Sequence, residues 1–316
     1  MGRVPRKPVR RGKRGLTDQE AGAQLPLSDW PAPDVSGSGV QITFQRVRPI
    51  WTEHKAKLIE RYLYYFVLIT HHGTYIDGFA GPQEADEPGM WAAKLVLESV
   101  PRWLQRFYLC ELKSSSVAAL EALVASQAPR NKEKGEPKRL VRIFPGDVNQ
   151  TMAEVLAEGN IPAKQATFCL LDQRTFECDW ATVKRLAEHK PPPHKIEIFY
   201  FLPAHWFGRA FHETHDKSKI ERWWGRDDWK TLGDMRDQER ADLLCSRVRD
   251  ELGYAYAYAW PIYSREEGEG RIKYHMVHAS DHAEAPKLMR RAYEQALNIK
   301  EPPEQLDWLK HPQGFA

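Results

Sequence analysis

Of the chain's 316 residues, 42% are apolar and 28% charged, which excludes a wholly disordered chain and predicts a globular protein with a substantial core. The four cysteines, Cys110, Cys169, Cys178 and Cys245, lack CxxC spacing and histidines at zinc-site intervals. We interpret them as free thiols in a reducing cytoplasm and expect no metal site. The longest apolar stretch, residues 62–69, is too short to cross a bilayer, so we expect no membrane association.

Charge is distributed unevenly along the chain. The net charge is +3, but residues 1–14 contain seven Lys or Arg and no acid, which leaves 39 basic and 43 acidic residues in the rest. Such an arm is either a solvated tail or a segment that binds RNA or DNA through phosphate neutralisation. We expect residues 1–45 to form a disordered basic leader, residues 46–300 one α/β domain, and residues 301–316 a C-terminal tail.

The first two thirds of the domain alternate between helical and strand patterns. Apolar residues recur at three- and four-residue steps over residues 52–71, which predicts an amphipathic helix. Short apolar runs then alternate with helical stretches, the order typical of a parallel sheet with helices on both faces. The predicted strands are 74–79, 106–111, 140–144, 167–172 and 195–202, and the predicted helices are 115–126, 148–158 and 180–188.

The last third differs in pattern. Residues 203–239 contain four tryptophans among many charges and predict a helical insertion, in which these rings either pack or stack on bases. After a predicted helix over 240–252, strands 254–263 and 271–279 flank a glycine-containing turn, which indicates a hairpin. A helix over 284–297 follows. The fold class is therefore α/β, with a mostly parallel central sheet and a late antiparallel hairpin.

The first predicted strand ends in the motif TyrIleAspGlyPheAlaGlyPro, residues 75–82. An acid followed by a glycine-containing turn at a strand's carboxyl end is typical of the ligand-binding edge of α/β proteins. Gly78 and Gly81 would let a ligand approach the backbone closely. We predict that Asp77, Gly78, Phe79 and Gly81 contact a cofactor.

Acids also follow the next three strands. Glu111 is placed to accept hydrogen bonds from both hydroxyls of a ribose, and Asp147, followed by Val148, from an adenine amino group. Asp172 closes the fourth strand, beside the expected reacting centre. Each acid taken singly is as readily explained as a helix N-cap or a turn residue, but the four together favour a ligand site.

The missing phosphate motifs narrow the choice of ligand. Neither GxGxxG nor GxxxxGK[ST] occurs at a strand end, so a nicotinamide, flavin or nucleoside triphosphate is not indicated. S-adenosyl-L-methionine has a ribose and an adenine but no pyrophosphate. A ribose-binding acid without a phosphate fingerprint therefore predicts this cofactor.

These motifs resemble those of the three-Cys-motif partner (TcmP) family, whose members are similar to Rossmann-like class I methyltransferases. The resemblance covers roughly residues 51–293. It depends on residues 53–63, on the motif at 75–82, on LeuLeuAspGln at 170–173 and on SerAspHis at 280–282. It implies a class I methyltransferase fold, S-adenosyl-L-methionine as cofactor, and a partner protein with a three-cysteine motif encoded nearby.

The resemblance also implies a catalytic turn after the fourth strand, which this sequence keeps only in part. Asp172 could accept a hydrogen bond from an acceptor amine, but Arg174 and Thr175 stand where an aromatic and glycine pair would begin. Phe176 could stack on a flipped base or could be a core aromatic. We therefore expect a methyltransferase acting on nucleic acid, supported by the basic arm and the basic loop at 130–142, or alternatively a non-catalytic subunit that binds a partner protein or nucleic acid.

Several other side chains have two interpretations. His54, Lys55 and Lys57 could reach the cofactor carboxylate or a phosphate, but charges at the start of a helix more often form a solvated face, which we favour. His275 and His278, with His282, lack zinc-site spacing, and we interpret them as structural.

Overall fold

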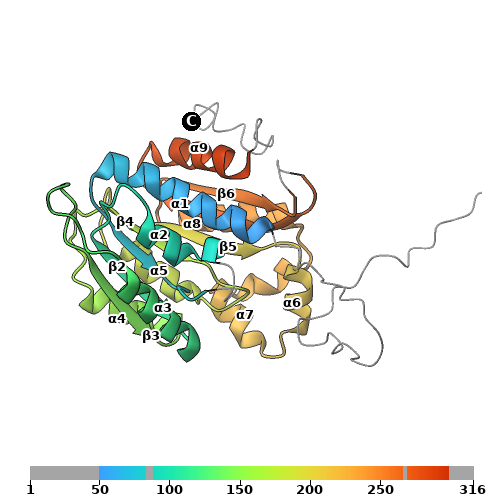
Figure 1. Cartoon of the computed structure of the whole chain (residues 1–316). Coiled ribbons are helices and arrows are strands. Elements are labelled where there is room, and N and C mark those ends of the chain that lie inside the picture. Colours follow the sequence, from blue (N-terminus) through green and yellow to red (C-terminus); the bar gives the residue numbers. More distant parts are fainter. Residues whose placement is uncertain (1–49, 83–87, 266–268, 299–316) are drawn as a thin grey trace, which may run out of the picture. The chain divides into compact units, whose positions relative to one another are not determined.

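The computed structural model describes residues 50–82, 88–265 and 269–298. Seven strands form one sheet in the order β3-β2-β1-β4-β5-β7-β6 (Figure 1). Strands β1 to β5 are parallel, β7 is antiparallel to β5, and β6 is antiparallel to β7. Their bounds are β1 Thr74–Asp77, β2 Arg106–Glu111, β3 Leu140–Pro145, β4 Thr167–Leu171, β5 Glu197–Pro203, β6 Tyr256–Tyr263 and β7 Ile272–Ser280. This is the Rossmann-like class I methyltransferase fold expected from the sequence.

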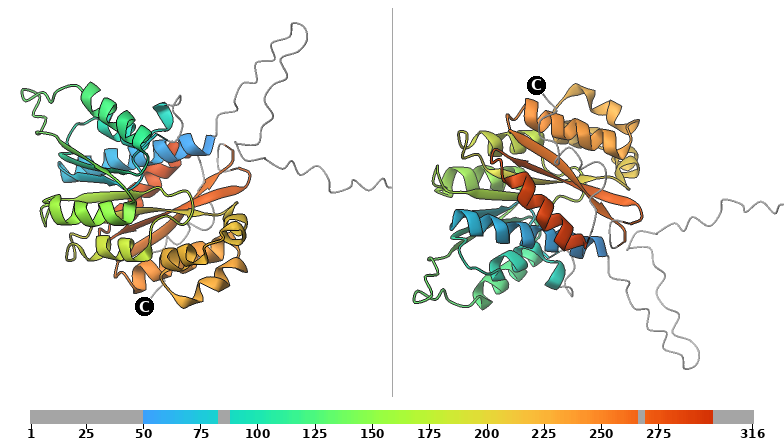
Figure 2. Two further views of the ribbon diagram at one scale, coloured as in Figure 1. Left: turned by 90° about the horizontal axis from the view of Figure 1, so that it is seen from below. Right: turned by 90° about the horizontal axis from the view of Figure 1, so that it is seen from above.

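Helices cover both faces of the sheet, as Figures 1 and 2 show. One face carries α1 Ile50–Thr70, α2 Ala92–Glu98, α3 Ser114–Ser126 and α9 Ala285–Leu297. The other carries α4 Val148–Glu158, α5 Trp180–Glu188, α6 Phe207–Glu213, α7 Lys217–Trp224 and α8 Asp237–Asp250. The described ranges also contain two 3₁₀ helices, η1 Pro88–Met90 and η2 Asp227–Gly233. The predicted helices and the helical insertion after β5 are confirmed, whereas η1 and α2 were not predicted.

Burial explains why the central strands read as continuous apolar runs. All five residues of β4 are buried, and β5 is buried from its second residue onward. A strand covered on both faces cannot alternate apolar and polar residues, because neither face meets water. The outermost strand on one side of the sheet, β3, is only partly buried, and Leu140 at its start is 44% exposed.

Helix α1 runs antiparallel to β4, from the carboxyl ends of the parallel strands to their amino ends. Its predicted apolar stripe is buried at Leu58, Ile59, Tyr62 and Phe66. Its first turns lie at the carboxyl ends of the parallel strands, and its last turn lies at their amino ends, where Ile69 is 47% exposed. We call these two sides of the sheet the carboxyl edge and the amino edge.

The four cysteines are buried and unbonded. None of the helices in the described ranges combines the length and apolarity that a bilayer crossing requires. The leader predicted over 1–45 and the tail predicted over 301–316 lie outside the described residues.

Candidate functional site

Asp77 fixes the turn that follows β1. Its side chain is 1% exposed, and its two carboxylate oxygens accept hydrogen bonds from the Tyr75 hydroxyl (2.7 Å) and the Phe79 backbone N–H (3.0 Å). The Gly78 N–H donates to the Leu170 carbonyl on β4 (2.9 Å). The motif at 75–82 therefore forms a tight turn that packs directly against the neighbouring strand.

The environment of Asp77 disfavours a negative charge. Its pKa is raised to about 7: burial is the largest cause, the charges of Asp172 and Glu111 add to it, and the hydrogen bonds from Tyr75 and Phe79 partly offset it. Three of the predicted acids, Asp77, Glu111 and Asp172, therefore lie at the carboxyl ends of the neighbouring strands β2, β1 and β4, close enough for their charges to interact. A cation placed among them would lower the pKa of Asp77 and would be attracted in turn.

Glu111 binds the far end of the same turn. Its Oε2 accepts from the Gly81 N–H and its Oε1 from the Lys113 N–H, both at 2.9 Å. A side chain at position 81 would overlap the Glu111 carboxylate and crowd Ser116, so only glycine fits there. Each carboxylate oxygen can accept a second hydrogen bond, which leaves capacity for a ligand. Leu112, the next residue, is 66% exposed and offers an apolar surface beside it.

Asp147 is the N-cap of α4, as one interpretation of the sequence expected. Its Oδ1 accepts from the Asn149 N–H (2.9 Å), while Oδ2 makes no hydrogen bond to any residue that the structure describes. The Gly146 N–H donates to the Glu111 carbonyl, which holds the ends of β3 and β2 together. Val148 is 4% exposed, and its side chain packs over Gly78. The cap thus uses one oxygen of Asp147 and leaves the other at the carboxyl edge.

Asp172 follows β4 and forms a buried ion pair with Lys55 of α1. The Lys55 Nζ lies 2.5 Å from the Asp172 Oδ2, and the two side chains are 5% and 6% exposed. The Lys55 ammonium also lies 5.8 Å from the centroid of the Tyr274 ring. The expectation of a solvated face is wrong for Lys55 and for His54, which is 7% exposed, because both lie on the buried side of α1. Lys57 is exposed, as expected, and pairs with Glu53.

The apolar periodicity of α1 contains a signal for the burial of Lys55. Leu58 and Ile59 lie three and four residues after it, so the apolar stripe of α1 passes through position 55. A cation on such a stripe is expected to be buried against an acid. Helix periodicity alone would therefore have predicted burial of Lys55.

The structure favours packing over base stacking for Phe176. Its ring is 5% exposed and makes edge-to-face contacts with Phe207 (5.7 Å) and Trp223 (4.9 Å). Trp223 and Trp224 are also buried. Trp206 is only partly buried, and its indole N–H donates to the Arg174 carbonyl (3.4 Å) beside Asp172. Trp206 therefore places a partly accessible aromatic ring against the turn that follows Asp172.

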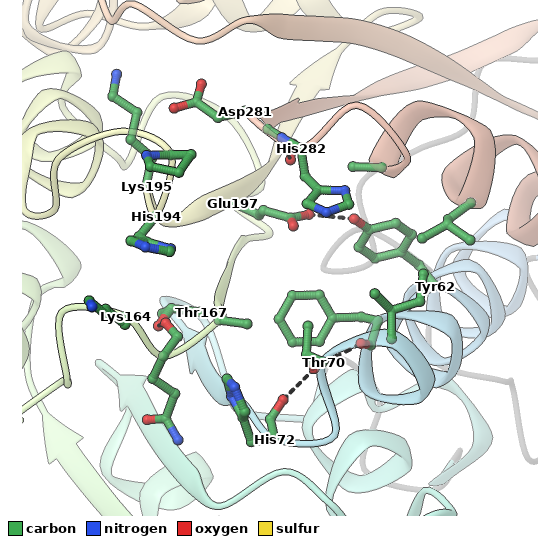
Figure 3. A pocket seen from close by; sticks show the side chains of 18 residues that line it. Tyr62, Thr70, His72, Lys164, Thr167, His194, Lys195, Glu197, Asp281 and His282 are labelled. Carbon is green, nitrogen blue, oxygen red and sulfur yellow. Dashed lines mark hydrogen bonds between the residues drawn. The ribbon is translucent and has the colours of Figure 1, made fainter.

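The basic loop lies elsewhere. It precedes β3, and because β3 is parallel to β2 and β1, the loop approaches the sheet from the amino edge. Arg130 donates to the carbonyls of Arg102 and Leu104, which also precede β2. The loop, which was expected from the sequence to support a nucleic-acid acceptor, therefore does not line the carboxyl edge. A cavity of about 290 Å³ also lies at the amino edge (Figure 3).

Comparisons with known proteins add no closer assignment. No family model matches the sequence, and no curated protein matches it. Among solved structures, the methyltransferase domain of bacterial CtHen1 is similar at 10% identity and a TM-score of 0.40, over 73% of this chain and 99% of that one. The DszA carbon methyltransferase is similar at 13% identity and a TM-score of 0.42, over 72% of this chain and 54% of that one. Protein LPL1258 from Legionella pneumophila is similar at 10% identity and a TM-score of 0.41, over 81% of this chain and 96% of that one. Since each TM-score is below 0.5, we base the fold assignment on strand order and direction.

Proposed function

We propose that the chain is an S-adenosyl-L-methionine-dependent methyltransferase related to the three-Cys-motif partner proteins. The supporting observation is the convergence of four acids at the carboxyl edge. They stand at the carboxyl ends of β3, β2, β1 and β4, which are consecutive neighbours in the sheet, and the charges of Asp172 and Glu111 both act on Asp77. Ligands of open α/β sheets bind at this edge.

The residues present fit the proposed cofactor. S-Adenosyl-L-methionine supplies an electrophilic methyl group on a positively charged sulfonium. A buried carboxyl group with a pKa of about 7 is complementary to such a cation. The unused capacity of Glu111 suits two ribose hydroxyls, and the unpaired Oδ2 of Asp147 suits an adenine amino group.

Asp172 is the residue we assign to the acceptor. Methyl transfer needs the nucleophile aligned with the sulfonium carbon and its proton accepted by a base or a hydrogen-bond acceptor. Asp172 can orient an amine or hydroxyl by accepting its hydrogen bond, with the ion pair to Lys55 holding the carboxylate in place. Lys55 is thus a positioning residue in this proposal.

Nucleic acid is the acceptor class we propose. The basic arm at 1–14 supports it, whereas the 130–142 loop lies at the amino edge, away from the acids. At the carboxyl edge, Arg174 is exposed beside Trp206. An exposed cation next to an accessible indole suits a phosphate next to an unstacked base. Trp206 replaces Phe176 as the proposed stacking residue.

A non-catalytic subunit is the second candidate, and the Lys55–Asp172 pair is the observation that favours it. A carboxylate already bound to a buried ammonium has less capacity for an acceptor, and the turn after it lacks the aromatic and glycine pair. In this case the chain would bind the cofactor, a three-Cys-motif partner protein or nucleic acid without transferring a methyl group.

Methyl transfer to cellular fractions separates the two candidates. The protein is incubated with methyl-labelled S-adenosyl-L-methionine and with total RNA, DNA or protein. Label in RNA or DNA supports the proposed enzyme, and label in protein would keep the activity but refute the acceptor class. Tight cofactor binding with no label in any fraction, with and without a coexpressed three-Cys-motif partner, would favour the non-catalytic subunit.

A further inference from the structure

The amino edge of the sheet contains a cavity of about 290 Å³, far from the acids at the carboxyl edge. Figure 3 shows side chains from several separate segments around it. They come from the end of α1, the loops that enter β4 and β5, and the segment joining β7 to α9. The proposed methyl transfer uses none of these residues.

A carboxylate is fixed in the wall of this cavity. Glu197, the first residue of β5, accepts a hydrogen bond from the Tyr62 hydroxyl on its Oε2, which also lies 3.1 Å from the His278 Nε2. Tyr62 and His278 are each 1% exposed, so the carboxylate is held by groups that cannot swing away. Its Oε1 has no partner among the described residues, and the side chain is 14% exposed. Glu197 therefore offers one fixed acceptor oxygen to the cavity.

Two further lining residues have buried polar atoms that lack hydrogen bonds to the described part of the chain. These atoms are the Asp281 Oδ2 and the His72 Nδ1. The other Asp281 oxygen is used, since it accepts from the Ala255 N–H (3.0 Å). A buried carboxylate oxygen without a donor is costly, and a bound ligand or water normally satisfies it. The lining of the cavity thus includes one acceptor oxygen of a fixed carboxylate, Glu197 Oε1, and a buried one, Asp281 Oδ2, whose hydrogen-bonding capacity is unused within the described residues.

The remaining wall is largely apolar. Phe66, Ile69, Ala285 and Leu288 line it, and Ile69 is 47% exposed at the end of α1. An exposed isoleucine beside a cavity gives an apolar ligand stem a surface to cover.

Cations near the cavity are largely committed to the protein. The Lys190 Nζ donates to the Gln165 carbonyl and the Thr167 hydroxyl, both at 2.7 Å. The Lys195 Nζ donates to the Leu252 carbonyl, lies over the Tyr254 ring and is attracted by the Asp281 carboxylate. Lys164 and His194 are exposed, so water screens them. The interior therefore favours a cation over an anion.

We propose that this cavity binds an organic amine, with its ammonium group between Glu197 and Asp281 and an apolar stem against Phe66, Ile69 and Leu288. The amine is either a free small molecule or a lysine side chain of another protein. The site is independent of the cofactor site at the carboxyl edge.

The test is a calorimetric and NMR titration of the full chain with n-pentylamine. We expect saturable binding, with no binding of 1-pentanol or pentanoate, which share the stem but lack the ammonium group. Glu197→Gln, which keeps the size and the hydrogen bond to Tyr62, should weaken binding about tenfold or more. Glu213→Gln, at an exposed position on α6, is the matched control and should not change it.

Two further arms complete the test. Asp281→Asn should also weaken pentylamine binding and serves if Glu197→Gln fails to fold by circular dichroism. A lysine-containing peptide is compared with its Nε-acetylated form to distinguish a protein source from a free amine. Equal binding of pentylamine and pentanol, unchanged affinity in both variants, or no binding of either amine source would overturn the proposal.

Discussion

The two edges of the sheet use carboxylates differently. At the carboxyl edge, Asp77, Glu111 and Asp147 accept hydrogen bonds from backbone N–H groups of the turns that follow their own strands. At the amino edge, Glu197 is held by side chains from α1 and β7, remote in sequence. The carboxylates at the carboxyl edge have partners close in sequence, so their positions can be predicted from the sequence. The partners of Glu197 are far away in the sequence and can be identified only from the structure.

The largest expected effect is at the Lys55–Asp172 pair. Replacing Asp172 with Ala leaves the Lys55 ammonium buried without a counter-charge, which should cost about 3–5 kcal/mol of unfolding free energy. We also expect Asp172→Ala to abolish methyl transfer while cofactor affinity stays within a few-fold. Urea unfolding and calorimetry measure the two effects.

A double variant provides the control. Lys55→Met combined with Asp172→Leu removes both charges, and most of the lost stability should return, because no unpaired charge remains. If the double variant is as unstable as Asp172→Ala, the loss has another cause. Lost cofactor binding in Asp172→Ala would instead place Asp172 in the cofactor site.

Phe176 and Trp206 should separate packing from stacking. Phe176→Ala empties a buried ring site beneath the carboxyl edge and should lower the unfolding free energy by about 3–5 kcal/mol. Trp206→Ala, at a partly exposed position, should lower it less but should weaken nucleic-acid binding by about 1–3 kcal/mol. Denaturation and fluorescence anisotropy check the pair. Nucleic-acid affinity lost in a folded Phe176→Leu variant, but not in Trp206→Ala, would restore the original assignment.

The buried His275 of β7 should make the stability of the fold depend on pH. Burial, with a contribution from Arg240, lowers the pKa of His275 to about 4, whereas an unfolded histidine has a pKa of about 6.5. Between these values the unfolded chain binds a proton that the folded chain does not. The unfolding free energy should therefore fall with decreasing pH, by about 3 kcal/mol in total.

Two variants test whether His275 causes this pH dependence of the unfolding free energy. His275→Leu should flatten the decline between pH 6.5 and pH 4, measured by urea unfolding at each pH. His278→Leu should retain it, because His278 lies on the opposite face of β7 beside Glu197. An undiminished slope in His275→Leu would contradict the explanation.

The smallest expected effects concern two glycines. Gly81→Ala would force the Glu111 carboxylate aside and should lower the unfolding free energy by about 1–3 kcal/mol. It should also weaken cofactor binding. Gly208→Ala, in α6 with open space around it, should instead stabilise by about 0.4–1 kcal/mol. Thermal unfolding compares them, and equal stability would show that position 81 is not crowded.

The sequence was sufficient for the sheet because buried parallel strands read as continuous apolar runs that end in acids. The acids after β1 to β4 could be predicted for the same reason. Helix α2 was missed because its seven residues are too few to show a period. The Lys55–Asp172 pair and the Glu197 cavity could not be located, since both depend on where α1 crosses the sheet.

Calorimetric titration with S-adenosyl-L-methionine and S-adenosylhomocysteine tests the proposed cofactor site most directly. The wild-type chain should bind both with micromolar affinity. Glu111→Ala should bind them at least about tenfold more weakly, because two hydrogen bonds to the ribose are lost. Glu197→Gln, at the amino edge, should bind as the wild type does. No binding at millimolar ligand, or equal affinity in Glu111→Ala, would show that the carboxyl edge is not a site for this nucleoside.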